Sequence, residues 1–484
     1  MYIDKIKNFS NKILKNNSHD IYILSNDWLY YKRFHPVEFE KYRLINKNIF
    51  EIILNIIFLF IKYQIKNIIL LILSLKNIYS KQIIINKKYD SIFVTYKFNK
   101  HYNFKNDAYF FDTYKLYRKN NKKFFVLAVN HQKTFFQKYQ IKNFCELNKL
   151  NNFFEEFYFF IKLNYYFLKF FVKIFKYNSI YEKKFFLLLS INFIKGNTFD
   201  NLRYYSQIKK HVKEKKINSI ISIYEGHALE RLIFRAAKSI NKNIKTIGYN
   251  HSFVTKKHNA VFLDLGNKNQ ADHVVFANQI SKEIFKKRDR HKNKSLIFCV
   301  TKDTSKINFN KKYSKKKNNI CLITPEGLNS ETIKLFEFSI KYLQKYSDII
   351  FIWRFHPIYY NREFKFIKKN FPLFFKFKKN IILSKKSLEE DFKISKYILY
   401  RGSSVVINAI RSNLIPINLV FKNEIDNNFL NECNLFSNLK LKNINELYRI
   451  NNLQIDIKKI NRNKKKILNL YSIHNNNNNL KYYL

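Results

Sequence analysis

The stretch "KYILYRGSSVVINAIRSNLIPINLV", residues 396–420, combines the signals of a strand, a turn, a helix and a second strand. Its first part, "KYILY" (396–400), is a short apolar run of the kind that forms a buried strand. A helix is predicted over 404–412, and "LIPINLV" (414–420) is the next apolar run. A strand, a crossover helix and a strand in this order predict a parallel sheet with helices on its faces.

The same alternation occurs in two separate regions of the chain. In the later region, strands are predicted over 320–325, 348–354 and 380–384, with a helix over 330–346. In the earlier region, strands are predicted over 91–96, 124–129, 218–224, 244–249 and 273–278, with a helix over 227–241. The sequence therefore predicts an α/β protein with two Rossmann-like, doubly wound domains facing each other across a cleft.

The expected domain limits follow from these patterns. The first Rossmann-like domain, for the acceptor, is expected over 88–308, with an aromatic-rich helical insert over 134–195. A linker rich in Lys and Asn follows over 309–319, and the second domain, for the nucleotide sugar, covers 320–470. Residues 1–87 are an N-terminal helical or unassigned segment, and 471–484, which contain "NNNNN", are an expected disordered tail.

The formal net charge is +55, from 90 Lys and Arg against 35 Asp and Glu. Lys, Asn, Ile, Phe and Tyr dominate the chain, and these are residues of A/T-rich codons, so much of the charge is attributed to a solvated surface. An anionic partner such as phosphate or a membrane surface is expected, and a nucleic acid is not required. The cysteines are scattered without zinc spacing, which is typical of a reduced, cytoplasmic compartment: Cys145, Cys299, Cys321 and Cys433.

Two segments raise the question of membrane contact. The apolar run at 52–75 is interrupted by Lys62 and Lys66, among other polar residues, so a buried or interfacial helix is favoured over a transmembrane one. The segment 157–177 places four lysines on one narrow helical face: Lys162, Lys169, Lys173 and Lys176. It is either a core helix with a solvated lysine stripe or a helix in an anionic membrane interface, which would place the protein peripherally on the inner membrane.

Polar residues and glycines gather where the predicted strands end. Because ligands of parallel sheets bind beyond the carboxyl ends of the strands, these residues are the candidate site. Glu225 and Gly226 follow 218–224, and His251 follows 244–249. In the second domain the candidates are Glu326 and Gly327, then Arg354 and His356, then Arg401, Gly402, Ser403 and Ser404.

Each candidate has a chemical role and an alternative. Gly402 permits a sharp turn, and a helix opened by Ser403 or Ser404 would bind phosphate, although Ser403 could simply cap that helix. Arg401 and Arg354 would contact phosphate oxygens, and His356 would assist phosphate departure. Glu225 or His251 would take a proton from an acceptor hydroxyl, although Glu225 could instead complement the dipole of the next helix.

The segments "YEGHALERLIFRAAK", "IGYNHS", "TPEGLNSE", "RFHP" and "YRGSSVVINAI" resemble the bacterial surface-carbohydrate biosynthesis proteins with a glycosyltransferase-B-like fold. The resemblance covers about 215–420. The His-Pro and Ser-Ser motifs are similar to those of bacterial sialyltransferases and capsule Kdo transferases. That resemblance implies that His356 meets the nucleotide phosphate, that Ser403 and Ser404 bind it, and that Glu225 is the base, although the motif's first acidic position is Tyr224 here.

The "NHS" segment is also similar to the histidine loop of polyol-phosphate transferases, which implies His251 as the rival base. The resulting expectation is a glycosyltransferase for capsule or lipopolysaccharide, using a CMP- or UDP-sugar and a polysaccharide or lipid-linked glycan acceptor. Inverting, metal-independent transfer without a cofactor is expected, because no Asp-x-Asp motif lies near these strand ends. The alternatives are a polyol-phosphate transferase, a nucleotide-sugar epimerase and a non-catalytic basic binding protein.

Overall fold

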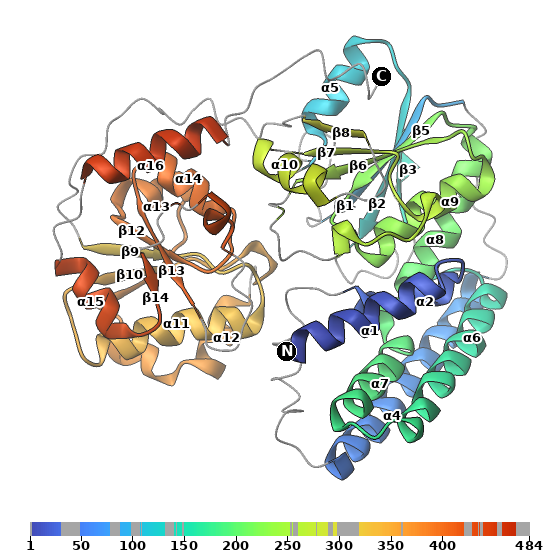
Figure 1. Ribbon diagram of the computed structural model, residues 1–484, viewed down its shortest axis with the longest axis horizontal. Helices are drawn as coiled ribbons and strands as arrows, with labels where there is room; N and C mark the ends of the chain where they lie inside the picture. Colours follow the sequence, from blue (N-terminus) through green and yellow to red (C-terminus); the bar gives the residue numbers. More distant parts are fainter. Residues whose placement is uncertain are drawn as a thin grey trace. The chain divides into compact units, whose positions relative to one another are not determined.

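The computed structural model describes residues 2–30, 49–77, 88–97, 107, 109–130, 140–141, 143–147, 150–251, 254, 260–276, 278–288, 294–297, 319–359, 362–420, 428–433, 435, 439–452 and 457–470. The chain divides into two compact units (Figure 1). We call them the N-terminal unit, with the elements from α1 to β8, and the C-terminal unit, with those from β9 to α16. Most of the predicted linker and the whole predicted tail lie outside the described residues.

The N-terminal unit is built on an eight-stranded sheet with the order β3-β4-β2-β1-β5-β6-β7-β8. All neighbouring strands are parallel except β3 and β4. The chain order runs outward in both directions from β1 and β5, so the sheet is doubly wound and reverses between these strands. The strands are β1 (Ser91–Lys97), β2 (Phe124–Asn130), β3 (Gln140–Ile141), β4 (Phe144–Glu146), β5 (Ser219–Ile223), β6 (Lys245–Asn250), β7 (His273–Phe276) and β8 (Lys294–Ile297).

Both faces of this sheet are buried, which explains why its strands are continuous apolar runs. On one face, Phe93, Val126 and Ile221 share a core cluster with Tyr114 and Tyr117 of α5 (Phe111–Lys119). Residue Phe125 points to the opposite face, where its ring lies 5.9 Å from His211 of α8. The helices α8 (Gly196–Lys215) and α9 (Ala228–Ile240) pack against each other, and α10 (Gln279–Arg288) contacts β7 and β8.

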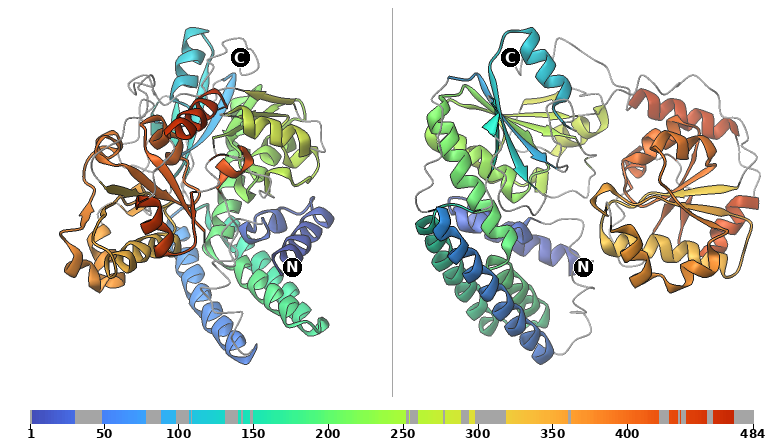
Figure 2. Two further views of the ribbon diagram at one scale, coloured as in Figure 1. Left: turned by 60° about the vertical axis from the view of Figure 1, so that its left-hand side comes forward. Right: turned by 180° about the vertical axis from the view of Figure 1, so that it is seen from behind.

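A separate group of helices completes the N-terminal unit (Figures 1 and 2). We call α4 (Ile49–Ser74), α6 (Phe153–Phe171) and α7 (Ile180–Phe193) the helical bundle, because each contacts the other two. The N-terminal helix α1 (Tyr2–Asn16) packs on α7 through Phe9 and Phe185, whose rings lie 5.5 Å apart. The remaining short elements are α2 (Ile21–Leu24), η1 (Asp27–Leu29), η2 (Leu75–Asn77), η4 (Val172–Lys176), η5 (Ala260–Phe262) and η6 (Asn267–Asn269).

The predicted helical insert over 134–195 is wrong in its first part. The strands β3 and β4 lie within it, and β4 pairs with β2 through Phe144 and Val126 as part of the main sheet. A strand of three residues is too short to show any periodicity in a sequence rich in aromatic residues. Among the described residues of this segment, helical structure begins at Phe153.

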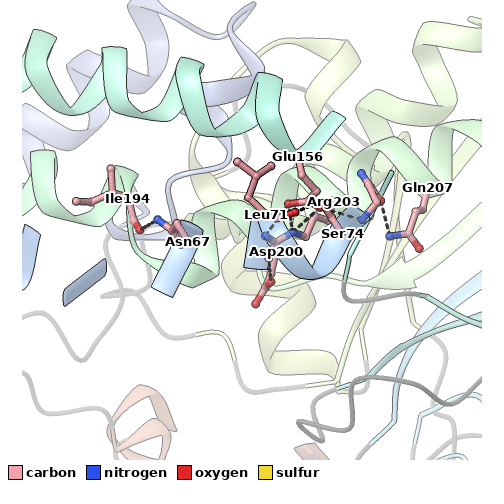
Figure 3. A network of polar contacts seen from close by, with 9 residues as sticks. Asn67, Leu71, Ser74, Glu156, Ile194, Asp200, Arg203 and Gln207 are labelled. Carbon is pink, nitrogen blue, oxygen red and sulfur yellow. Dashed lines mark hydrogen bonds and ion pairs between the residues drawn. The ribbon is translucent and has the colours of Figure 1, made fainter. Parts of the chain in front are cut away.

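A buried polar network fastens the helical bundle to α8 (Figure 3). Arg203 of α8 pairs with Glu156 of α6, with 2.7 Å between Nη2 and Oε2, and both side chains are buried. Arg203 also pairs with Asp200 at 2.8 Å. Nearby, the Asn67 amide of α4 donates a hydrogen bond to the carbonyl of Ile194, at 2.9 Å. The Arg203–Glu156 pair therefore joins α6 to α8, and the Asn67 hydrogen bond joins α4 to the end of α7.

The C-terminal unit contains a six-stranded, fully parallel sheet with the order β11-β10-β9-β12-β13-β14. Its chain reverses between β9 and β12, as the first sheet does between β1 and β5. The prediction of two Rossmann-like, doubly wound domains is therefore confirmed, while their exact limits stay a prediction. The strands are β9 (Ile320–Ile323), β10 (Ile350–Trp353), β11 (Ile381–Leu383), β12 (Tyr397–Tyr400), β13 (Ile415–Leu419) and β14 (Lys440–Leu441).

The core of the C-terminal unit centres on Trp353, which is fully buried. Its ring stacks 4.1 Å from that of Phe336, and its indole N–H donates to Ser339 at 2.9 Å. Both partners belong to the longest helix of this unit, α11. The helices are α11 (Asn329–Leu343), α12 (Glu363–Asn370), α13 (Leu388–Ile394), α14 (Val405–Arg411), α15 (Ile444–Asn452) and α16 (Ile457–Leu470), with short η7 (Pro357–Tyr359), η8 (Pro372–Phe377) and η9 (Phe429–Cys433).

Candidate active site

In each unit the sequence-predicted site residues lie at the carboxyl ends of neighbouring strands. Glu225 follows β5 and His251 follows the adjacent β6. In the C-terminal unit, the candidates follow β9, β10 and β12, which are three consecutive strands of the sheet. The parallel order therefore gathers each set at one edge, beside the reversal point where ligands of such sheets bind.

Glu225 lies between two imidazoles. Its Oε2 is 3.3 Å from Nε2 of His227, and its Oε1 is 3.8 Å from Nε2 of His251. We call these three residues the acid–imidazole cluster; all are partly exposed. The structure thus places the two rival bases, Glu225 and His251, side by side, and adds His227, to which the sequence assigned no role.

Tyr109 also belongs to this site, and no sequence pattern indicated it. Its ring packs edge-on against His251, with 4.8 Å between the ring centres. Burial, together with the charges of Glu225 and Asp107, raises the pKa of Tyr109. A phenol that stays protonated beside the imidazole restricts the positions that the His251 ring can take.

The turn that carries Glu225 has no room for a side chain at Gly226. Gly226 has φ +83, and a Cβ there would lie 2.4 Å from the carbonyl group of Ala260. Glu230, which is buried in α9, accepts hydrogen bonds through one oxygen from the backbone N–H groups of Glu225, Gly226 and His227, at 2.6, 2.6 and 3.0 Å. A buried carboxylate therefore fixes the backbone of the acid–imidazole cluster.

Replacing Glu230 tests this anchoring. Burial raises the pKa of the Glu230 carboxyl from 4.5 to about 7, and His227 opposes this while Glu225 adds to it. Because the folded-state pKa is the higher one, the stability that it contributes is complete below about pH 4.5 and is lost as the pH rises through about 7. Relative to Glu230→Gln, the wild type should lose on the order of 3 kcal/mol of unfolding free energy over this range, as measured by urea denaturation.

The variant Glu230→Ala should be destabilised by more than about 2 kcal/mol, because it leaves three backbone donors unpaired. Glu230→Gln retains an acceptor oxygen and should keep most of that stability at pH 7. Equal stability of the two variants would contradict the anchoring role.

A buried ion pair lies at the same edge of the N-terminal sheet. Nζ of Lys97, the last residue of β1, is 2.6 Å from Oε2 of Glu146, the last residue of β4. Both side chains are buried. The only sign of this ion pair in the sequence was a lysine directly after an apolar run. Many solvated strand ends show the same pattern, so the pair could not be predicted.

His356 of the C-terminal unit packs on Gly327. Gly327 has φ +92, and a Cβ there would lie 2.8 Å from Nδ1 of His356. Partial desolvation lowers the pKa of the exposed His356, and the nearby Glu326 carboxylate opposes this shift. The structure thus brings Glu326, Gly327 and His356 together, with the imidazole resting on a glycine that leaves it space.

Of the two predicted phosphate-binding arginines, Arg354 makes side-chain contacts within the protein and Arg401 is buried. Nη1 of Arg354 lies 2.6 Å from the buried Asp391 carboxylate and donates to the Lys386 carbonyl at 2.9 Å. Arg401 is buried, and its carbonyl accepts a hydrogen bond from Asn418 at 2.7 Å. The Arg354 side chain therefore has a structural role in the protein. Phosphate binding stays a prediction for both arginines.

The "RGSS" turn agrees with the expectation in part. Ser404, one of the two serines expected to open the helix, is exposed and holds the N-cap position, and its side chain makes no capping hydrogen bond. Ser403, the alternative cap, is buried. Among the described glycines, those with positive φ are Gly226, Gly266 and Gly327, so the turn at Gly402 does not use left-handed backbone. With seven residues, α14 is also too short for a strong helix-end field, so phosphate contact here depends on hydroxyl and N–H groups.

Comparison with known proteins yields likeness of structure alone. No family model matches the chain, and no curated protein matches it. A lipopolysaccharide outer core galactosyltransferase has 9% identity and a TM-score of 0.45 over 81% of this chain and 99% of its own. The Anabaena protein HepE, solved with UDP and glucose, has 10% identity and a TM-score of 0.46 over 82% of this chain and 99% of its own.

A UDP-GlcNAc 2-epimerase of Methanocaldococcus jannaschii has 13% identity and a TM-score of 0.45, covering 78% of this chain and 99% of its own. At such identities and TM-scores these likenesses carry no argument about activity. The fold class rests instead on the two strand orders described above.

Proposed function

We propose that the protein is a glycosyltransferase that moves a sugar from a CMP- or UDP-type donor to a surface polysaccharide or lipid-linked glycan. The observation that carries the proposal is the contact between Glu225 and His251 at the carboxyl edge of β5 and β6. A carboxylate beside an imidazole is an arrangement suited to removing a proton from a hydroxyl near neutral pH.

In this proposal His251 is the base and Glu225 the residue that orients it. An imidazole suits the role of base because its ordinary pKa lies near neutral pH, and a neighbouring carboxylate suits the role of a hydrogen-bond acceptor that holds the ring in place. His251 takes the acceptor hydroxyl proton as the oxygen forms a bond to the sugar carbon. The bond from that carbon to the phosphate oxygen breaks, so the configuration inverts and the nucleotide leaves with the electron pair.

The C-terminal unit supplies the group that helps the nucleotide leave. His356 is exposed at the end of β10, and as a donor it would stabilise charge on the departing phosphate. Ser404, exposed and unused as a cap, would donate a second hydrogen bond from the end of β12. The remaining proposed contacts are Glu326, Gly327, Arg354, Arg401, Gly402 and Ser403.

The proposed setting is the cytoplasmic side of the inner membrane, where a lipid-linked acceptor is found. The segment 157–177, which forms α6 and η4, would make a peripheral contact with anionic lipid there. The four lysines that the sequence placed on one face of this segment support that contact.

The test is release of nucleotide from CMP- and UDP-sugars by the full chain, with and without a glycan acceptor. We expect nucleotide release to require the acceptor and to continue when a metal chelator is present. His356→Ala should lower it by about a hundredfold or more, while His19→Ala, also an exposed histidine, should have no effect. Conversion of the sugar to its epimer without any acceptor would overturn the proposal.

A further inference from the structure

The helices α4 and α6 each expose an apolar stripe with the same spacing. On α4 the stripe residues are Leu54, Phe58, Ile61, Ile65, Ile68 and Ile72. On α6 and the start of η4 they are Phe154, Tyr158, Ile161, Tyr165, Leu168 and Val172. Steps of four and three residues keep each set on one helical face, and all twelve side chains are between 45% and 71% exposed.

These stripes are not the faces by which the helices pack. The opposite face of α6 is buried through Phe159, Leu163 and Phe170, and that of α4 through Ile56 and Leu70. Each helix therefore has two apolar faces, of which the described part of the protein covers one. A helix of a soluble bundle would carry polar residues on the outer face, so the exposed stripes indicate a non-aqueous neighbour.

The two stripes lie next to each other. The Gln64 side chain of α4 donates a hydrogen bond to that of Asn164 of α6, and the rings of Phe60 and Phe167 are 4.7 Å apart. These pairs show that the helices run antiparallel and side by side. The blue helix of the bundle, α4, lies beside the teal helices in the rear view of Figure 2. Together the stripes form one continuous surface, which we call the apolar face.

Lysines border the apolar face on both outer sides. The residues that contact the other helix come one position before a stripe residue. On α4 they are Phe60 and Gln64, which come just before Ile61 and Ile65. Five lysines come one position after a stripe residue, and one residue turns the helix by about 100°, so these lysines point away from the helix contact. They are Lys62 and Lys66 on α4, and Lys162, Lys169 and Lys173 on α6 and η4.

Within α4 and α6, acidic groups do not offset these lysines. The only acidic residue of α4 is Glu51 in its first turn. Those of α6 are Glu155 and Glu156, which pair with Lys210 and Arg203 of α8. An apolar surface with basic margins complements a bilayer leaflet with anionic head groups.

We propose that α4 and α6 form a lipid-binding surface that lies in the plane of an anionic membrane leaflet without crossing it. This extends the membrane contact proposed above for 157–177 to α4, and it holds whichever reaction the chain catalyses. Of the described residues, Ile53–Ser74 is the one segment long and apolar enough to cross a bilayer, with 17% of its apolar window buried. Crossing would place Lys62 and Lys66 in the hydrocarbon, whereas lying flat keeps every lysine at the head groups.

The first experiment is flotation of the full chain with vesicles of phosphatidylcholine, with or without about a third phosphatidylglycerol. Binding to the anionic vesicles is expected. The α4 variant Phe58→Gln/Ile61→Gln/Ile65→Gln should weaken it at least tenfold. The matched control is Phe364→Gln/Leu373→Gln/Phe375→Gln, which alters three exposed apolar residues of the C-terminal unit and should bind normally.

The second experiment measures depth with single tryptophans, after Trp28 and Trp353 are replaced by Phe. Lipids brominated near the head groups should quench the tryptophan fluorescence of three single-tryptophan variants equally: Leu54→Trp, Ile61→Trp and Ile72→Trp. A middle probe that is deeper than both end probes would show a crossing helix and overturn the proposal. Unchanged vesicle binding by the α4 variant would also overturn this proposal, while leaving the membrane contact of 157–177 intact. A dimer that persists in the presence of vesicles would show that a second copy of the chain covers the apolar face.

Discussion

His251→Ala is expected to lower the rate of acceptor-dependent sugar transfer by about a thousandfold or more. The variant removes the group proposed to take the hydroxyl proton, and general-base catalysis is typically worth 10²–10⁴-fold. Glu225→Gln keeps the shape of the side chain but removes the charge that orients the imidazole across 3.8 Å. Its expected loss is smaller, about ten- to a hundredfold, and is measured as the kcat for transfer at saturating donor.

Two controls separate the base from a structural histidine. Added imidazole should restore part of the transfer by His251→Ala, because a free imidazole can occupy the space and accept the proton. His227→Ala removes the other imidazole on Glu225, 3.3 Å away, and should retain most of the activity. If Glu225→Gln were the inactive variant and His251→Ala remained active, Glu225 would be the base instead.

Arg203→Ala should destabilise the N-terminal unit by about 3–5 kcal/mol, because it leaves the buried Glu156 carboxylate without its partner. The chain has only two tryptophans, Trp28 in this unit and Trp353 in the other. In a Trp353→Phe background, the fluorescence of Trp28 therefore reports urea unfolding of the N-terminal unit alone.

A second ion pair between the same two helices is the matched control. Lys210 and Glu155 also lie 2.7 Å apart, but their side chains are 41% and 27% exposed. Lys210→Ala should cost less than about 1 kcal/mol, since solvent screens the pair. The apolar replacement Arg203→Met/Glu156→Leu should recover much of the loss, and a loss of equal size in Lys210→Ala would show that burial does not decide the effect.

The sequence predicted the strands at the centre of both sheets. Apolar runs such as 124–129 and 396–400 became β2 and β12, because strands buried on both faces need apolar residues at every position. The same reasoning located the strand ends, and hence the proximity of Glu225 to His251. The expected parallel order of the two strands predicted this contact, whereas the identity of Glu225 or His251 alone did not.

Other features could not be predicted because they depend on contacts distant in sequence. Tyr109 and His251 are 142 residues apart in the sequence, and only the folding of the N-terminal sheet brings them into contact. The sequence indicated Arg354 as a phosphate ligand but gave no sign of its ion pair with Asp391, which lies in α13. The lysine stripe on 157–177 was visible in the sequence, but the exposed apolar stripe beside it and its pairing with α4 required the folded bundle.

The bridge between Glu156 and Arg203 has a consequence for how the protein would find its acceptor. It joins α6, part of the proposed lipid-binding surface, to α8, and α8 packs on α9, which begins directly after His227 of the acid–imidazole cluster. If α4 and α6 lie on a leaflet, the acid–imidazole cluster is held at a fixed distance from the membrane surface and at a fixed angle to it. The search for a lipid-linked hydroxyl then becomes diffusion in two dimensions, and the approach angle of that hydroxyl is set before it arrives.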